Sequence, residues 1–239
     1  MIDIIVPAYK EGDNILPLFD EIAQKIKTPH RVTVVCDMND DPTIETIAKT
    51  KNKYNFDIKS IINTYGRGPL NAIKFGIDNV TADYILVMMA DSSDKLEAVD
   101  LMRKKMEQGF DIVCGSRYVK DGQQINSPAF KGFLSKYAGL SLHLLCKIPT
   151  HDITNSFKMY RRSILPNIKI ESTGGFEIGM EITVKAYIKG YKIAEIPSIW
   201  IEHNNRKSNF KLWRWLPKYL YWYFWCLYKF WIKQIDFKN

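Results

Sequence analysis

Short, almost continuously apolar segments alternate with longer helical patterns in this chain, and this alternation restricts its fold more than any other feature. The expected strands, rich in Ile, Val and Leu, are Asp3–Pro7, Arg31–Cys36, Phe56–Asn63, Asp83–Met88 and Asp111–Cys114. The expected helices between them are Asn14–Lys27, Thr43–Asn52, Pro69–Asn79 and Lys95–Gln108. Because strands that are apolar on both faces are typical of parallel sheets, the sequence predicts an α/β fold with a mostly parallel central sheet flanked by helices.

The composition is that of a globular protein in a reducing compartment. Hydrophobic residues make up 46% of the 239 residues and charged residues 25%, which suits a chain that buries a core. The four cysteines, Cys36, Cys114, Cys146 and Cys226, form no C-x-x-C pair, which argues against a zinc site or a disulfide framework. Strand character begins at Ile2, so no signal peptide is expected. These features favour a cytoplasmic location.

Polar side chains follow three of the expected strands at the point where each strand ends. They lie in Pro7–Glu11, Asp37–Asp41 and Asp91–Asp94. In a parallel sheet these ends meet at one crevice, where their carboxylates would repel each other unless a divalent cation such as magnesium or manganese were bound. The same residue types are favoured as helix caps, which is the alternative for Asp37 or Asp94 taken alone. Together the three ends favour a site, and we expect the nucleotide crevice to come from the first half of the chain.

A glycine pair, Gly66 and Gly68 with Arg67 between them, opens the third expected helix. Exposed amides at a helix start with a nearby arginine suit a phosphate group, and a plain tight turn is the alternative. The dinucleotide-binding fingerprint does not fit, because its third glycine is missing.

In order along the chain, these segments resemble glycosyltransferase family 2, and in particular its dolichol-phosphate mannose synthase-like branch. The segments that carry the resemblance are IIVPAYKEGDNI, VVCDMNDDPT, GRGPLNAIKFG and VMMADSSD, followed by GSRYV, DITNSFKMYRR and GYKIAEIPSIW. The resemblance covers roughly residues 1–212. It implies a GT-A fold, a nucleotide-sugar donor, a bound Mg²⁺ or Mn²⁺ and direct transfer that inverts the anomeric configuration.

The resemblance also implies roles for individual residues in donor binding. Residues expected at the nucleotide sugar are Pro7, Ala8, Tyr9, Glu11, Asp37, Gly66, Arg67 and Gly68. Asp91 is expected to bind metal and diphosphate. Met89 stands where the family has the first Asp of its D-x-D motif, so Asp94, with Ser93, is expected to supply the missing oxygen ligands.

Two further departures from the family pattern leave open a weakened or inactive enzyme. Cys36 stands where the first Asp of the second motif is expected. The family's R-x-x-G-x-S-K motif reads as His203–Asn209 in this chain, so Arg206 or Lys207 is expected to replace its cationic diphosphate contacts.

The acceptor site follows from the same resemblance. A phosphate acceptor is already ionised and needs cations for positioning rather than a general base. The family's acceptor-phosphate residues correspond to Arg117, Lys131 and Ser135, although a solvated basic loop is the alternative for a single lysine. If the acceptor is a sugar hydroxyl, Glu177 and Glu181 are base candidates, because they lie one helical turn apart on one face.

The C-terminal segment carries most of the net charge. From Trp200 to Asn239 it has eight basic and two acidic residues, and it therefore accounts for +6 of the total of +8. On a helix, one arc of about 100° holds Lys211, Arg214, Lys218, Lys229 and Lys233. Opposite to them lie Trp213, Leu216, Leu220, Phe224, Leu227 and Trp231.

This pattern predicts an amphipathic helix on an anionic membrane surface. The uncharged run Tyr219–Tyr228 is too short to span a bilayer, which takes about 20 residues. Nucleic-acid binding is disfavoured because the rings are segregated from the cations. Docking on its own domain or on a partner chain is the alternative. The predicted organisation is thus a catalytic domain at 1–210 and a membrane-interface helix at 211–239.

The leading hypothesis is transfer of a hexose from GDP-mannose or a UDP-sugar to polyprenyl phosphate at the cytoplasmic face of a membrane, by a peripheral enzyme. The alternatives are transfer to a sugar hydroxyl of a free or lipid-linked glycan, and a non-catalytic membrane adaptor with the same fold.

Overall fold

The computed structural model describes residues 1–203 and 212–236, with side chains up to residue 232 in the second range. The strands are β1 (Ile2–Ala8), β2 (His30–Cys36), β3 (Asp57–Ile62), β4 (Tyr84–Val87), β5 (Ile112–Ser116), β6 (Gln123–Ile125), β7 (Lys158–Arg161), β8 (Ile193–Pro197) and β9 (Ile199–Ile201). The α-helices are α1 (Leu16–Lys25), α2 (Pro42–Thr50), α3 (Pro69–Asp78), α4 (Val99–Glu107), α5 (Ala129–Cys146), α6 (Ile178–Ile188) and α7 (Leu212–Asp236). Short 3₁₀ turns cover Gly12–Ile15, Lys51–Lys53, Leu96–Ala98 and Arg162–Asn167.

Within the described residues, seven strands form one sheet in the order β3-β2-β1-β4-β7-β5-β8. β1 pairs in parallel with β2 and β4, whereas β7 runs antiparallel between β4 and β5. A separate short parallel pair joins β6 to β9. The expected α/β fold with a mostly parallel sheet is confirmed, and the reversed strand β7 is a feature that the sequence did not predict.

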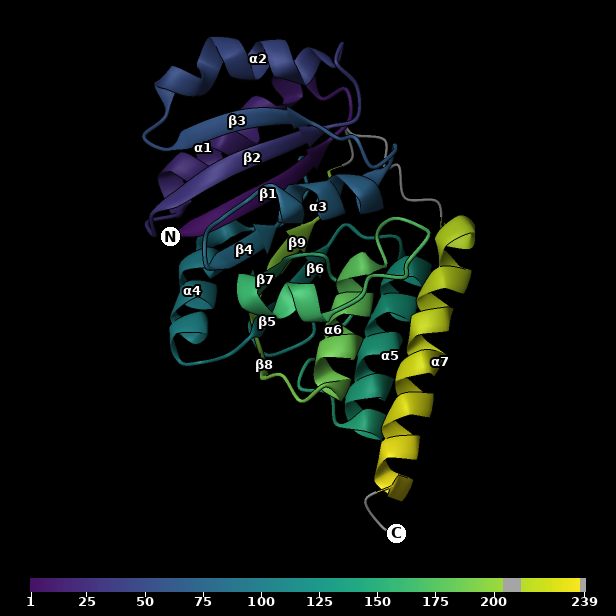
Figure 1. Ribbon diagram of the computed structural model, residues 1–239. Helices are drawn as coiled ribbons and strands as arrows, with labels where there is room; N and C mark the ends of the chain where they lie inside the picture. The colour runs from purple at the N-terminus through teal and green to yellow at the C-terminus, as the bar shows by residue number, and fades with distance from the viewer. Residues whose placement is uncertain (204–211, 237–239) are drawn as a thin grey trace.

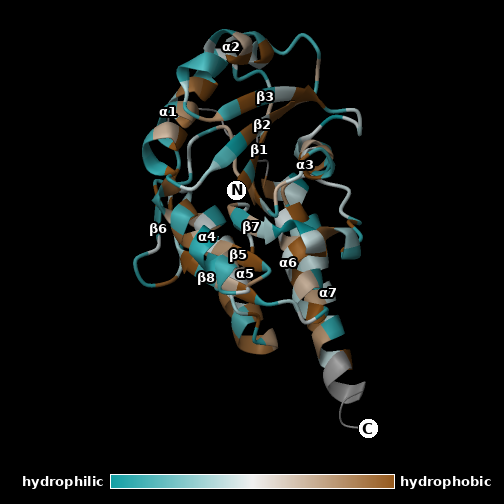
Figure 2. Ribbon diagram, turned by 60° about the vertical axis from the view of Figure 1, so that its left-hand side comes forward, coloured by the Kyte–Doolittle hydropathy of each residue, from teal (hydrophilic) through white to brown (hydrophobic). Residues whose placement is uncertain are grey.

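Helices cover both faces of this sheet, and the alternation of side chains along β1 shows why. Ile4 and Val6 belong to the cluster that includes α1, α2 and α4, whereas Ile5 packs with α3 and α6 on the other face. Gly76 lets α3 approach closely, because a Cβ atom there would lie 2.6 Å from Ile5 Cγ2. The brown colour of the central strands shows how hydrophobic their residues are (Figure 2).

A third apolar cluster lies outside the sheet, where α5, α6 and α7 run side by side (Figure 1). Trp215, Trp222 and Cys226 of α7 are buried, so this helix docks on its own domain along one face. Trp213 and Phe224 of the same helix are 75% and 60% exposed. In the described part of the chain, no helix combines the length and the apolar character needed to cross a bilayer.

Candidate active site

A cleft of about 890 Å³ opens at the carboxyl ends of β1, β2 and β4. Most of the residues predicted to bind the donor or the metal line it, namely Pro7, Ala8, Tyr9, Glu11, Asp37, Arg67, Gly68, Asp91 and Ser93. Gly66 and Asp94 do not line it. Arg206 and Lys207, the cations expected to contact the diphosphate, lie outside the described residues. The strand ends that the sequence singled out therefore converge on one cleft.

Asp37, at the end of β2, holds the glycine turn against the neighbouring strand ends. Its Oδ1 accepts a hydrogen bond of 2.8 Å from Asn63 Nδ2, and its Oδ2 accepts one of 2.8 Å from the backbone N–H of Gly68. Gly66 and Gly68 have φ values of 103° and 109°, which favour glycine. Capping of α2, the alternative role for Asp37, is instead performed by Asp41, which accepts from the N–H of Thr43. The turn that follows β3 is thus fixed beside the cleft.

The acidic segment after β4 places Asp91 and Asp94 in different surroundings. Asp91 lines the cleft, and its Oδ1 accepts a hydrogen bond of 3.0 Å from the N–H of Ser93. Asp94 is buried beneath it, and its backbone forms a bridge with Trp200. Burial and then the negative charge of Asp91 raise the pKa of Asp94 to about 8. Asp94 Oδ1 is buried without a hydrogen-bond partner among the described residues.

These two carboxylates fit a partial ligand set for a divalent cation. A cation would offset the repulsion between Asp91 and Asp94 and would give the unpartnered oxygen of Asp94 an interaction. Among the described residues, no group of three His, Cys, Asp or Glu side chains is arranged to hold a metal ion alone. Mg²⁺ in nucleotide sites is commonly held by one or two carboxylates together with substrate phosphates, and this pattern agrees with the residues present.

The second half of the chain contributes a wall of the cleft that the sequence did not predict. Besides the expected residues, the cleft is lined by Gly174, Phe176, Trp200, Glu202, His203, Arg214 and Trp215. The expectation that the crevice comes from the first half of the chain alone is therefore wrong. His203 Nε2 lies 3.2 Å from the carbonyl oxygen of Ser92, which brings β9 next to the acidic segment.

A second depression, a groove of about 380 Å³, lies between α5 and α7. Its walls are mainly apolar and include Leu134, Tyr137, Ala138, Met180, Leu212, Leu216, Tyr219, Leu220 and Tyr223. Arg117, Lys131 and Ser135, the predicted acceptor residues, also line it. Lys131, Phe176 and Trp200 line both the groove and the cleft, so the two spaces adjoin.

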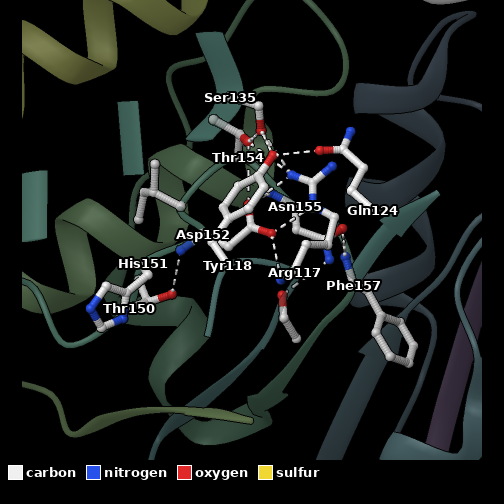
Figure 3. Close-up of polar contacts among 12 residues, drawn as sticks. Arg117, Tyr118, Gln124, Ser135, Thr150, His151, Asp152, Thr154, Asn155 and Phe157 are labelled. Carbon is white, nitrogen blue, oxygen red and sulfur yellow. Dashed lines mark hydrogen bonds and ion pairs between the residues drawn. The ribbon is translucent and has the colours of Figure 1, made fainter. Parts of the chain in front are cut away.

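Arg117, at the end of β5, is the centre of a buried polar network (Figure 3). Its Nε and one terminal nitrogen bind the two carboxylate oxygens of Asp152 at 2.6 and 2.7 Å. The same terminal nitrogen donates to Ser135 Oγ at 2.9 Å and to Thr154 Oγ1 at 3.2 Å. Burial opposes the charge of Arg117, but Asp152 outweighs burial and raises the pKa of the guanidinium. Arg117 is thus a fixed, permanently charged group whose charge is partly balanced by Asp152.

Lys131, from α5, lies where the cleft and the groove meet. Its Nζ is 3.9 Å from Glu202 Oε2 and 5.3 Å from the centroid of the Trp200 ring. Burial is the main reason why the pKa of Lys131 is lowered. This cation, unlike Arg117, faces both spaces.

Glu177 and Glu181 are not placed to act as a general base, which corrects that expectation. Both side chains are fully buried, and neither lines the cleft or the groove. Glu177 accepts hydrogen bonds from the N–H groups of Gly174 and Gly175, at 2.8 and 2.7 Å. Glu181 accepts from the N–H of Ser172 at 2.9 Å and from Lys185 Nζ at 2.6 Å. These carboxylates hold the loop before α6 in place.

A mostly parallel sheet with helices on both faces and an acidic cleft at its strand ends agree with the GT-A fold of glycosyltransferases. Residues 3–168 match the sequence model of glycosyl transferase family 2, and the chain belongs to that family.

Two relatives have names that concern polyprenol lipids. The chain is 30% identical to the dolichol-phosphate mannosyltransferase of Pyrococcus furiosus over 199 residues, which are 82% of this chain and 55% of that protein. It is 27% identical to the polyprenol monophosphomannose synthase of Mycolicibacterium smegmatis over 228 residues, which are 89% of this chain and 85% of that protein. The chain thus spans little more than half of the Pyrococcus relative.

The fold has a close counterpart among solved structures. The mannosyltransferase PcManGT from Pyrobaculum calidifontis, in complex with GDP-Man and Mn²⁺, matches with a TM-score of 0.64 and 16% identity. The match covers 93% of this chain and 62% of that one. At this identity the similarity shows the shared fold alone.

Proposed function

We propose that this protein transfers a hexose from a nucleotide sugar, GDP-mannose or a UDP-sugar, to polyprenyl phosphate at the cytoplasmic face of a membrane. Membership of glycosyl transferase family 2 supports the reaction type. The names of the two relatives, with dolichol phosphate and polyprenol monophosphomannose, support the acceptor class. The solved complex of a structural neighbour with GDP-Man and Mn²⁺ supports a nucleotide sugar and a divalent cation.

The groove between α5 and α7 is the observation that carries the acceptor assignment. It combines apolar walls, which suit an isoprenoid chain, with Arg117, Lys131 and Ser135. Among the described residues that line this groove, none is acidic. A sugar hydroxyl would need a base to remove its proton, whereas an ionised phosphate needs only cations to hold it. This groove therefore favours a lipid phosphate over a glycan hydroxyl.

In the proposed reaction, a phosphate oxygen of the acceptor attacks the anomeric carbon of the sugar. The new carbon–oxygen bond forms as the bond to the nucleoside diphosphate breaks, so the anomeric configuration inverts. Lys131, at the junction of groove and cleft, attracts the acceptor phosphate toward the donor. Arg117, held rigid by Asp152, fixes the orientation of Ser135 through the 2.9 Å hydrogen bond between them.

On the donor side, charged residues hold the nucleotide and the divalent cation. Asp37 keeps the glycine turn in position, while Tyr9 and Glu11 line the part of the cleft assigned to the nucleoside. Asp91 and Asp94 would hold a divalent cation, which when bound neutralises charge on the leaving diphosphate. Burial of this site strengthens such interactions relative to water.

An acceptor series tests this proposal with full-length protein and labelled GDP-mannose or UDP-sugars in the presence of Mn²⁺. We expect transfer to polyprenyl phosphate. Transfer to the matching polyprenol should be at least about hundredfold slower, because the charge-assisted contacts of Lys131 and Ser135 to the phosphate are lost. Transfer to oligosaccharide acceptors without a lipid phosphate would replace the proposal by the glycan-hydroxyl alternative. Donor binding without transfer to any acceptor would support the non-catalytic adaptor.

A further inference from the structure

The first turn of α7 contributes Arg214 and Trp215 to the wall of the donor cleft. From the sequence, this helix was expected to lie on a membrane or to dock on its own domain or a partner chain, with no part in donor binding. Trp215 is only 8% exposed, and its indole N–H is buried without a hydrogen-bond partner among the described residues. Buried donors are almost always paired in folded proteins, so a buried, unpaired donor on a cleft wall points to an acceptor atom supplied by a ligand.

Close packing on several sides fixes the indole ring of Trp215. Phe176 meets it edge-on with ring centroids 5.9 Å apart, and the Arg214 guanidinium lies 5.2 Å from the ring centroid. A Cβ atom added to Gly175 would lie 3.2 Å from Trp215 Cη2 and 2.9 Å from Pro69 Cγ. Gly175 therefore fills the narrow space between α7 and the start of α3, next to the glycine turn of the donor site.

The loop beneath Trp215 is itself held rigidly. The Glu177 carboxylate accepts from the N–H groups of Gly174 and Gly175, as described above. From α7, Lys218 Nζ donates to Thr173 Oγ1 at 3.3 Å and Trp222 Nε1 donates to Ser172 Oγ at 2.9 Å. The N-terminal part of α7 is thus fixed relative to the cleft at both the loop and the indole.

Charge on the cleft wall indicates which ligand atoms these groups meet. Asp37 and Asp91 bring negative charge to the cleft, whereas Arg67, in the turn before α3, and Arg214, in α7, bring positive charge. Arg214 is exposed, and it precedes the buried N–H of Trp215 directly in sequence. A cation beside an N–H donor suits phosphate oxygens, and the position of both in the first turn of a helix adds a favourable dipole.

We propose that Arg214 and the indole N–H of Trp215 bind the diphosphate of the donor, so that α7 is a structural part of the donor site. This inference rests on the proposed function, because it takes the donor to be a nucleotide sugar. It gives the chain a diphosphate-binding cation in addition to the residues at 206 and 207 that the family pattern suggested. α7 then joins the nucleotide site to the face that carries the exposed aromatic side chains.

The test is calorimetry of the full-length protein without membranes, using GDP and UDP with Mn²⁺ and the matching nucleosides as probes. For the nucleoside diphosphate that binds, Arg214→Ala is expected to weaken affinity about three- to tenfold, within the range for a partly solvated charged contact. Trp215→Phe replaces the indole by a smaller aromatic ring without an N–H, and should weaken the affinity about two- to tenfold. Affinity for the matching nucleoside should be unchanged in both variants. Arg162→Ala and Trp213→Phe, which alter an exposed arginine and an exposed indole that do not line the cleft, should bind like the wild type.

Each result has a distinct meaning. If neither nucleoside diphosphate binds the wild type, the proposed function fails, and this inference fails with it. If one nucleoside diphosphate binds the wild type, and the Arg214→Ala and Trp215→Phe variants bind it with wild-type affinity, only the role of α7 is overturned. If diphosphate affinity is unchanged while the KM for polyprenyl phosphate rises, the two groups serve the acceptor phosphate and the donor assignment is overturned. Thermal unfolding of each variant separates these outcomes from loss of fold.

Discussion

At the scale of single residues, the replacement of an expected aspartate by Met89 draws attention to Asp94. Asp94 is buried with one unpartnered carboxylate oxygen among the described residues, and Asp91 lies close enough to raise its pKa. A carboxylate in this position is costly unless a cation is bound. Met89 thus removes one carboxylate of the family's D-x-D motif, and Asp94 provides another carboxylate three positions after Asp91.

This arrangement predicts different effects for the two aspartates. Asp91→Ala is expected to abolish the Mn²⁺-dependent part of donor binding, because Asp91 lines the cleft. Asp94→Ala should weaken it about tenfold or more, since charged contacts contribute about 1.5–3 kcal/mol. Calorimetry with and without Mn²⁺ measures both effects. Asp40→Ala, which removes an exposed carboxylate outside the cleft, is the control, and an Asp94→Ala protein with wild-type metal dependence would exclude Asp94 as a ligand.

At the scale of elements, the turn between α5 and β7 determines how Arg117 is presented. Asp152 in this turn accepts from the side chain and the backbone N–H of Arg117. The fully buried Lys158, at the start of β7, donates from Nζ to the carbonyl oxygens of Ile153 and Asn155. The reversed strand and the turn before it are therefore held as one unit behind the acceptor residues.

From this unit we predict that Asp152→Ala destabilises the protein by about 3–5 kcal/mol, because it leaves the charge of Arg117 buried without a partner. Thermal or urea unfolding measures this loss. The KM for polyprenyl phosphate should rise at the same time.

The double variant Arg117→Met, Asp152→Leu separates stability from function. Apolar replacement of a buried ion pair is often neutral for stability, so this variant should regain most of the folding free energy. It should not regain acceptor use, while its affinity for the donor should stay near that of the wild type. Recovery of normal acceptor kinetics in the double variant would show that Arg117 has no part in acceptor positioning.

The elements also show what could be predicted from the sequence and what could not. The strands β1 to β5 and the helices between them were found because long apolar runs and regular periodicity reflect burial by the sheet. β7 was missed because Lys158–Arg161 is short and charged, and its burial depends on hydrogen bonds made by the turn before it.

The candidate site was predictable only where a strand end signalled it. Asp37 directly follows the apolar strand β2, Asp91 follows β4 after three apolar residues, and both line the cleft. Trp215 and Arg214 reach the cleft from a distant helix, and no local pattern distinguishes them from the other aromatic and basic residues of α7. Glu177 and Glu181 were misjudged because spacing on a helix does not reveal that backbone N–H groups and Lys185 occupy both carboxylates.

At the scale of the whole molecule, exposed large apolar side chains are concentrated on α5 and α7. Those on these two helices are Phe130, Phe133, Tyr137, Leu144, Leu145, Trp213, Leu220, Tyr221, Phe224, Tyr228 and Trp231. Arg214 and Lys229 are exposed on α7 as well, while Lys211 and Lys233, two further members of the predicted cationic arc, have no described side chains. Concentrated exposed apolar surface of this kind marks an interaction site.

We predict that this face binds vesicles that contain anionic lipid. Binding of the full-length protein should weaken with added salt, because each basic residue near the surface contributes about 1 kcal/mol. A salt-resistant part should remain, and the triple variant Trp213→Ser, Phe224→Ser, Trp231→Ser should remove it. Co-sedimentation across a salt series measures both parts.

The control for this prediction is Leu101→Ser, since Leu101 is 42% exposed on α4, away from the aromatic helices. It should sediment with vesicles like the wild type. Wild-type protein that stays in the supernatant at low salt would show that α5 and α7 present this surface to something other than a membrane.

Lys131, Phe176 and Trp200 border both the cleft and the groove, and the apolar part of the groove extends away from them between α5 and α7. In the proposed reaction, the spent nucleotide therefore departs into water, whereas the glycosylated lipid slides sideways along the groove and stays in the leaflet. A carrier lipid that never leaves the leaflet also meets its next enzyme by diffusion in two dimensions.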